Sequence, residues 1–323
     1  MKALVTGAAG FIGSHLCERL LMDGWDVIGL DNFDRFYDPS VKRANIAACL
    51  EQKAFSLIEG DIRDVERVGS IFGRNTVDII VHLAAKAGVR PSIEDPLGYQ
   101  DVNINGTMVM LEAAKKYEVK KFIFASSSSV YGNNKKVPFG ETDNVDFPIS
   151  PYAATKKAGE LICHTYHHLY EIDMTCLRFF TVYGPRQRPD LAIHKFTRLM
   201  EADQPIPVFG DGSMARDFTY IDDILQGVLA AMAHCRGYKI YNLGESCPCR
   251  LDDLIAHIEK ALGKKAVIQR LPVPPGDVMG TFAEITRARR ELGYNPVTQL
   301  PEGLRHFVQW FRAGSGAKQA HNQ

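Results

Sequence analysis

The sequence lacks a long hydrophobic run, a net charge and a cysteine framework. No apolar stretch reaches the roughly 18 uninterrupted residues of a membrane span, so we expect no membrane partner. Its 38 Lys and Arg residues balance 38 Asp and Glu residues, which leaves no global basic field to attract nucleic acid. The seven cysteines are odd in number and mostly scattered among apolar residues, a pattern that favours reduced thiols in a cytoplasmic protein.

The sequence also has little that could hold a metal ion. Cys247 and Cys249 form the only close cysteine pair, and no second pair stands at metal-ligand spacing. His164 and His168 are four residues apart on an expected helix, but no Glu follows His164 as an HExxH motif requires. We therefore expect no metal and interpret these histidines as helix surface or dimer face.

What the chain does have is alternation of strand and helix patterns over its first half. Apolar strand patterns and helical patterns follow one another at 2–6, 11–22, 25–30, 55–58, 64–73, 78–82, 99–117, 121–125, 152–171 and 174–179. Such alternation predicts an α/β fold, a Rossmann-type doubly wound parallel sheet with crossover helices.

The texture of the sequence changes after residue 180, where Pro and Gly become denser and the elements shorter. We predict a domain over 1–180, a smaller C-terminal substrate-binding lobe over 181–313, and a disordered tail over 314–323. Helices of the smaller lobe are expected near 193–203, 221–234, 251–262, 286–292 and 301–312.

A glycine-rich turn joins the first strand to the first helix. It reads Gly7-Ala8-Ala9-Gly10-Phe11-Ile12-Gly13, and this strand-turn-helix context is typical of a dinucleotide site. Small residues let backbone N–H groups approach a pyrophosphate, and the helix N-terminus adds a positive dipole end. Asp31 ends the second strand, where a carboxylate can accept from both ribose hydroxyls and would repel a 2′-phosphate. The pattern favours NAD over NADP.

A Ser, Tyr, Lys constellation lies further along the chain. Tyr152 and Lys156 are spaced i, i+4 on one helix face, and a Lys ammonium near a phenol lowers the pKa of the phenol. Ser126–Ser129 follows a buried strand at its C-terminal end, where ligands bind in open parallel sheets. A Ser hydroxyl there can hydrogen-bond the reacting oxygen beside Tyr152, which would act as a general base.

Together these motifs resemble the extended short-chain dehydrogenase/reductase family. The resemblance extends over about 1–312 and includes HLAA at 82–85, SSSSVYG at 126–132 and RFFTVYGP at 178–185. It implies an NAD-binding domain, a nucleotide-sugar lobe, a homodimer pairing the helices at 99–117 and 152–171, and catalytic residues Ser127, Tyr152 and Lys156. It adds further cofactor contacts at Asn32, Asp61, Ile62, Leu83, Ala84, Ala85 and Lys86.

The positions after Ser127 argue for an epimerase. Dehydratases of this family carry an Asp-Glu pair there, and decarboxylases carry an acidic residue, whereas this chain has Ser128 and Ser129. The resemblance then implies that Tyr152 takes the proton of a sugar 4-OH while C4 gives hydride to NAD⁺. The ring of the 4-keto sugar then rotates about its link to the diphosphate, and hydride returns to its other face.

Arg188 indicates which substrate the chain binds. The segment 183–192, YGPRQRPDLA, resembles the RPDMA-type segment of UDP-glucuronate 4-epimerases, with Leu191 in place of Met. There the Arg faces the sugar carboxylate, and a guanidinium can bind a carboxylate through two charge-assisted hydrogen bonds. By the same resemblance, the expected substrate contacts are Arg90, Ser127, Ser128, Thr181, Arg188, Lys195, Val208, Arg216 and Asp277.

Three alternatives stay open at this point. The substrate pair could be UDP-glucose and UDP-galactose, for which no carboxylate clamp is needed. The enzyme could decarboxylate UDP-glucuronate. Outside enzymes, the chain could be a protein that binds NAD or a nucleotide sugar without turnover, against which the complete Ser127, Tyr152 and Lys156 set argues.

Overall fold

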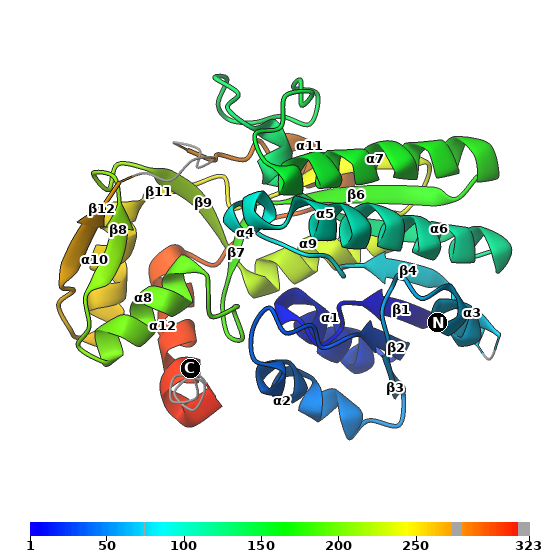
Figure 1. The fold of residues 1–323 in the computed structure, drawn as a ribbon, viewed down its shortest axis with the longest axis horizontal. Helices are drawn as coiled ribbons and strands as arrows, with labels where there is room; N and C mark the ends of the chain where they lie inside the picture. Colours follow the sequence, from blue (N-terminus) through cyan, green and yellow to red (C-terminus); the bar gives the residue numbers. More distant parts are fainter. Residues whose placement is uncertain (74, 273–279, 316–323) are drawn as a thin grey trace.

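The computed structural model describes residues 1–73, 75–272 and 280–315 and has a seven-stranded parallel sheet at its centre (Figure 1). The strand order is β10-β6-β5-β4-β1-β2-β3. Their bounds are β1 Lys2–Thr6, β2 Asp26–Asp31, β3 Phe55–Glu59, β4 Ile79–His82, β5 Lys121–Ser127, β6 Asp173–Phe179 and β10 Tyr238–Leu243. The order reverses between β1 and β4, and the carboxyl ends of strands at such a switch point form the ligand crevice of doubly wound sheets. The predicted α/β fold is confirmed.

Helices cover both faces of the sheet. One face packs against α1 Phe11–Met22, α2 Pro39–Leu50 and α9 Ile221–Ala233, and the other packs against α3 Val65–Phe72, α6 Gly106–Lys116 and α7 Pro151–Tyr170. The strands alternate their apolar side chains between the two cores, as Val5 and Leu4 of β1 illustrate. Burial on both faces makes the central strands almost continuously apolar.

The segment before α6 departs from the predicted single helix at 99–117. The chain instead forms α4 Val89–Glu94, α5 Pro96–Gln100, a π-helical turn over Asp101–Asn105, and then α6. The turn places Asn103 inward, where its side chain donates to the Lys86 carbonyl oxygen at 2.9 Å and to Thr155 Oγ1 at 3.0 Å. The irregular turn thus ties the loop after β4 to helix α7.

The second half of the chain builds two small sheets beside the large one. The first has the order β11-β9-β7 and the second pairs β12 with β8; the bounds are β7 Thr181–Tyr183, β8 Ile206–Phe209, β9 Ala215–Tyr220, β11 Pro248–Arg250 and β12 Ile268–Leu271. Their helices are α8 Ala192–Glu201, α10 Leu251–Leu262, α11 Thr286–Leu292 and α12 Leu300–Trp310. Figure 1 shows α8, α10 and α12 together at the end of the molecule opposite α3.

One strand of this second half returns to the large sheet. β10 pairs in parallel with β6, from Tyr238 opposite Met174 to Leu243 opposite Phe179, and α9 is the crossover helix that brings it there. The sequence predicts this helix, near 221–234, but no strand after it. The division of the chain at residue 180 stays a prediction.

Candidate active site

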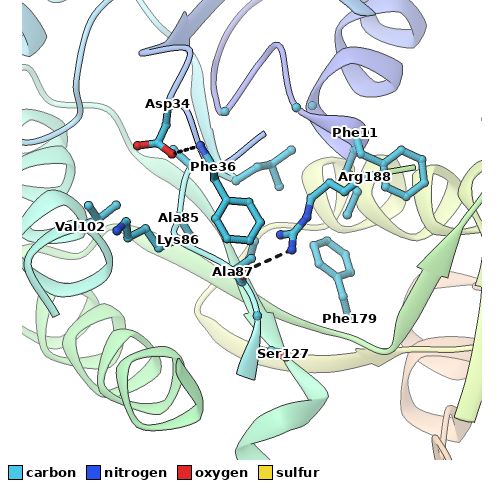
Figure 2. A pocket seen from close by; sticks show the side chains of 18 of the residues that line it. Phe11, Asp34, Phe36, Ala85, Lys86, Ala87, Val102, Ser127, Phe179 and Arg188 are labelled. Carbon is cyan, nitrogen blue, oxygen red and sulfur yellow. Dashed lines mark hydrogen bonds between the residues drawn. The ribbon is translucent and has the colours of Figure 1, made fainter. Parts of the chain in front are cut away.

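A cavity of about 500 Å³ opens at the carboxyl ends of the central strands (Figure 2). Its walls come from the glycine turn after β1, the ends of β2, β4, β5 and β6, the start of α7, and strand β7 with the loop after it. The sequence-predicted residues that line it are Gly7, Gly10, Phe11, Ile12, Gly13, Asp31, Asn32, Asp61, Ile62, Leu83, Ala84, Ala85, Lys86, Ser127, Ser128, Tyr152, Lys156, Thr181 and Arg188.

The glycine turn owes its shape to very close backbone packing. Gly7 adopts φ 69°, a left-handed conformation that favours glycine. A Cβ on Gly13 would lie 2.1 Å from the Gly7 carbonyl oxygen, so no larger residue fits there. Gly10 caps helix α1 with no side-chain hydrogen bond to its first turn, so the N–H groups of that turn rely on ligand or solvent. This is the geometry of an anion site at a helix N-terminus.

Asp31 fixes the turn from the neighbouring strand. Its buried carboxylate accepts from the backbone N–H of Ala9 at 3.0 Å and from that of Phe33 at 2.8 Å. A carboxylate has about four lone-pair sites, so Asp31 retains acceptor capacity toward the cavity. Beside it, Asn32 donates to Asp61 at 2.9 Å, and hydrogen bonds from Arg63 lower the pKa of Asp61 to about 2.

The three catalytic candidates meet at the floor of the cavity. Ser127 is the last residue of β5, and helix α7 begins just before Tyr152 because Ser150 accepts from the Ala153 N–H at 3.2 Å. Tyr152 is hydrogen-bonded to Ser127. Lys156, one turn further along the helix, is buried and donates to the Ala125 carbonyl oxygen at 2.7 Å.

The charges at this site correct one prediction. Burial raises the pKa of Tyr152 above its ordinary value of 10.0, although the Ser127 hydrogen bond and the positive charge of Arg188 act in the opposite direction. Burial also lowers the pKa of Lys156 to about 8. The lowered Tyr152 pKa that we expected from the i, i+4 spacing is therefore wrong for the chain by itself. The cost of burying a phenolate outweighs the nearby cations, and the Lys156 ammonium points at a backbone carbonyl.

Several residues of the cavity were missed by the sequence analysis. Tyr99 packs edge-on against Tyr152, with 6.2 Å between ring centroids, and donates to the Ala87 carbonyl oxygen at 3.1 Å. Tyr37 and Phe36 come from the loop after β2 and also line the cavity. No local pattern marks Tyr99, since only the folding of distant segments brings it to the site.

Lys86, whose role the sequence left open, lies at the edge of the cavity. Its backbone is clamped by Asn103, and its Nζ donates to Asp95 at 2.5 Å. The side chain thus forms an ion pair at the cavity edge.

The remaining predicted substrate contacts lie outside this cavity. Lys195 belongs to α8, Val208 to β8 with a fully buried side chain, and Arg216 to β9. The Arg90 guanidinium packs over the Phe209 ring at 4.2 Å from the centroid. Asp277 lies outside the described residues. The roles of these residues in holding a nucleotide stay predictions.

Within residues 1–73, 75–272 and 280–315, no three His, Cys, Asp or Glu side chains come together as a metal ion would require. In the same residues, no helix is both long and apolar enough to cross a membrane.

Comparison with known proteins supports the reading of the site. The chain is 47% identical to UDP-glucuronate 4-epimerase 4 of Arabidopsis thaliana, over 99% of this chain and 77% of that protein. The structure of UDP-glucuronic acid 4-epimerase from Bacillus cereus in complex with UDP-glucuronic acid and NAD matches with a TM-score of 0.92 and 40% identity, over 97% of this chain and 99% of that one. UDP-glucose 4-epimerase from Thermotoga maritima matches with a TM-score of 0.89 and 35% identity, over 97% and 99%.

The family model described as "NAD dependent epimerase/dehydratase family" matches residues 3–244, which include the glycine turn, Ser127, Tyr152, Lys156 and Arg188. The match covers most of the chain and agrees with the resemblance drawn from the motifs. The chain belongs to the NAD-dependent epimerase/dehydratase family.

Proposed function

We propose that this chain is an NAD-dependent epimerase that interconverts UDP-glucuronate and UDP-galacturonate at C4. One observation carries the proposal: a single cavity joins Ser127, Tyr152 and Lys156 to the guanidinium of Arg188. The first three residues suit proton movement at a sugar hydroxyl, and the fourth suits a sugar carboxylate. The similar proteins named above include UDP-glucuronate 4-epimerases from a plant and a bacterium.

The residues of the cavity fit NAD. The glycine turn leaves the first turn of α1 open to a pyrophosphate, and Asp31 offers a buried carboxylate to a ribose. Leu83, Ala84 and Ala85, at the end of β4, line the same cavity. When bound, NAD supplies an acceptor and donor of hydride, so that C4 can be oxidised and reduced with no net redox change.

The catalytic residues then have distinct roles toward the sugar 4-oxygen. Tyr152 holds and returns the proton of the 4-OH, and Ser127 orients the same oxygen through its hydroxyl. The cation of Lys156 sits one helical turn from Tyr152, and its pKa near 8 keeps it largely charged at neutral pH. Because burial raises the pKa of Tyr152, the positive charges of Arg188 and of the bound cofactor are needed to favour the phenolate.

Removal of the Ser127 hydroxyl tests this proton arrangement. Activity requires the phenolate form of Tyr152, so the rate should rise with pH as that phenol loses its proton. The Ser127 hydrogen bond lowers the Tyr152 pKa, so Ser127→Ala should move the acidic limb of the pH profile of kcat to higher pH. We also expect kcat at pH 7 to fall about tenfold, the size of one lost hydrogen bond to a charged group. An exposed control, Ser70→Ala, should match wild type, and an unmoved acidic limb in Ser127→Ala would contradict this role.

The product test of the function needs purified protein, UDP-glucuronate and no added cofactor, with products followed by NMR. UDP-galacturonate is the expected product. UDP-pentose as the main product would instead indicate a decarboxylase. Turnover of UDP-glucose with no reaction of UDP-glucuronate would assign the neutral sugar pair, and copurified NAD with no product from either sugar would indicate a binding protein.

A second copy of this chain is the partner that we propose. Helices α6 and α7 lie side by side on one face of the sheet (Figure 1), and they leave Met108, Leu161 and Leu169 exposed to solvent. Pairing these helices with their copies would bury the apolar side chains. Sedimentation velocity should therefore give the mass of a dimer, and Leu161→Glu should shift it toward monomer. A monomeric wild-type protein would refute the pairing.

The cytoplasmic location stays a prediction from cysteine usage.

A further inference from the structure

Asp190 holds the guanidinium that the proposed function assigns to the sugar carboxylate. Arg188 Nε donates to Asp190 Oδ1 at 3.0 Å, and Arg188 Nη2 donates to Asp190 Oδ2 at 2.7 Å. Two parallel hydrogen bonds of this kind fix a guanidinium in its plane. Arg188 lines the cavity and Asp190 does not, so the carboxylate of Asp190 grips the guanidinium from outside the cavity.

Two more contacts restrain the same guanidinium. Nη2 also donates to the Ala87 carbonyl oxygen at 3.3 Å, and the Phe36 ring lies 5.1 Å from Cζ (Figure 2). One edge of the guanidinium and one face are therefore occupied by the protein. Among the described residues, none accepts a hydrogen bond from Nη1, which leaves that nitrogen as the donor for an incoming group.

We propose that Asp190 is a positioning residue that presents Arg188 Nη1 to the substrate carboxylate in one fixed orientation. The inference rests on the proposed function and deepens it. An arginine side chain has many rotamers, and holding it in one of them before the substrate arrives removes the entropy cost of ordering it from binding. It also fixes the direction from which the sugar carboxylate is held.

The orientation of that carboxylate decides the fate of the oxidised sugar. With a ketone at C4 and a carboxylate on C5, the sugar is a β-keto acid. If the C5–carboxyl bond aligns with the carbonyl π system, that bond breaks and CO₂ leaves. The electron pair of the broken C5–carboxyl bond then forms the C4–C5 enolate, which takes a proton from solvent at C5. A guanidinium held rigidly by Asp190 keeps the carboxylate out of this alignment, and a mobile one does not.

Three variants test the role of Asp190, with UDP-glucuronate as substrate and NMR as the readout. Asp190→Ala should raise the ratio of decarboxylated sugar to UDP-galacturonate about tenfold over wild type, the effect of roughly one charge-assisted hydrogen bond. It should raise KM for UDP-glucuronate more than it lowers kcat. Asp190→Asn keeps one acceptor oxygen, so its product ratio should lie between those of wild type and Asp190→Ala. Asp190→Glu should retain much of the wild-type product ratio.

A matched control comes from the same segment. Arg186 pairs with Glu18 at 2.8 Å and does not line the cavity, so Glu18→Ala removes a comparable ion pair and should leave the product ratio unchanged. If Asp190 has only a structural role, Asp190→Ala will lower the thermal unfolding midpoint without changing the product ratio, and the inference is overturned.

A competing role for Asp190 would have the opposite effect on KM. If Asp190 competes with the substrate carboxylate for Arg188, Asp190→Ala will lower KM with clean products, which also overturns the inference. Wild-type protein that makes no UDP-galacturonate would remove the proposed function and this inference with it. Wild-type activity together with an unchanged product ratio in Asp190→Ala would remove the inference alone.

Discussion

Replacement of Tyr152 by phenylalanine is expected to lower kcat for epimerisation of UDP-glucuronate by about 10²–10⁴-fold, the contribution typical of a positioned acid–base group. The phenol is the group hydrogen-bonded to Ser127 at the cavity floor, and its ring packs against Tyr99. The variant keeps the ring and loses only the oxygen. We therefore expect the fold, the bound NAD and KM to change little while the rate collapses.

Tyr170→Phe is the matched control, since Tyr170 is the last residue of the same helix and does not line the cavity. Steady-state kinetics at pH 8, with absorbance of the purified protein as a check for bound cofactor, would separate the two variants. A Tyr152→Phe enzyme that retains more than a tenth of wild-type kcat would show that another group moves the proton.

Replacement of Arg188 by alanine is expected to change which sugar the enzyme accepts and which product it releases. A charged hydrogen-bonding partner contributes about 1.5–3 kcal/mol, so KM for UDP-glucuronate should rise about 10- to 100-fold. UDP-pentose should appear, because the C5 carboxylate of the 4-keto sugar is no longer held. The positive charge of Arg188 also lowers the Tyr152 pKa, so the acidic limb of the pH profile should move to higher pH.

Arg186→Ala provides the comparison for this variant. Arg186 lies two residues away and pairs with Glu18, outside the cavity lining. Product analysis by NMR and kinetics with UDP-glucose should be measured for both variants, since a neutral sugar has no carboxylate to lose. Clean UDP-galacturonate at the wild-type rate from Arg188→Ala would refute the carboxylate role.

The parts of the site that could be predicted are those that depend on the spacing of residues close together in the sequence. Gly7, Gly10 and Gly13 form one turn between a strand and a helix, and the i, i+4 spacing of Tyr152 and Lys156 places both on one helix face. Such patterns need only the identity of the surrounding elements, which the alternation of apolar runs indicates. The helices α1 and α10 begin and end where the sequence predicts them.

What could not be predicted depends on contacts between distant segments. Tyr99 reaches Tyr152 across 53 positions only because the irregular stretch before α6 packs against α7. β10 joins the large sheet through a crossover that no local pattern announces. The Tyr152 pKa is raised because burial, a property of the whole fold, outweighs the effect of a neighbouring cation.

The paired hydrogen bonds between Arg188 and Asp190 could not be predicted from the sequence either. The two residues are only two positions apart, yet whether their side chains turn toward each other depends on the loop that follows β7. Spacing alone gives the identity of a charged pair and not its geometry. The same holds for Phe36, whose place over the guanidinium follows from the conformation of the loop after β2.

In the proposed reaction, C4 of the sugar loses a hydride and receives it back within one site. The most direct measurement uses UDP-glucuronate carrying deuterium at C4, purified protein, ordinary water and no added cofactor, with the product examined by NMR. We expect UDP-galacturonate that retains deuterium at C4, because the hydride that leaves C4 is returned to it before exchange with solvent. UDP-galacturonate carrying protium at C4 would mean that the hydrogen at C4 leaves as a proton, and would refute hydride transfer at C4.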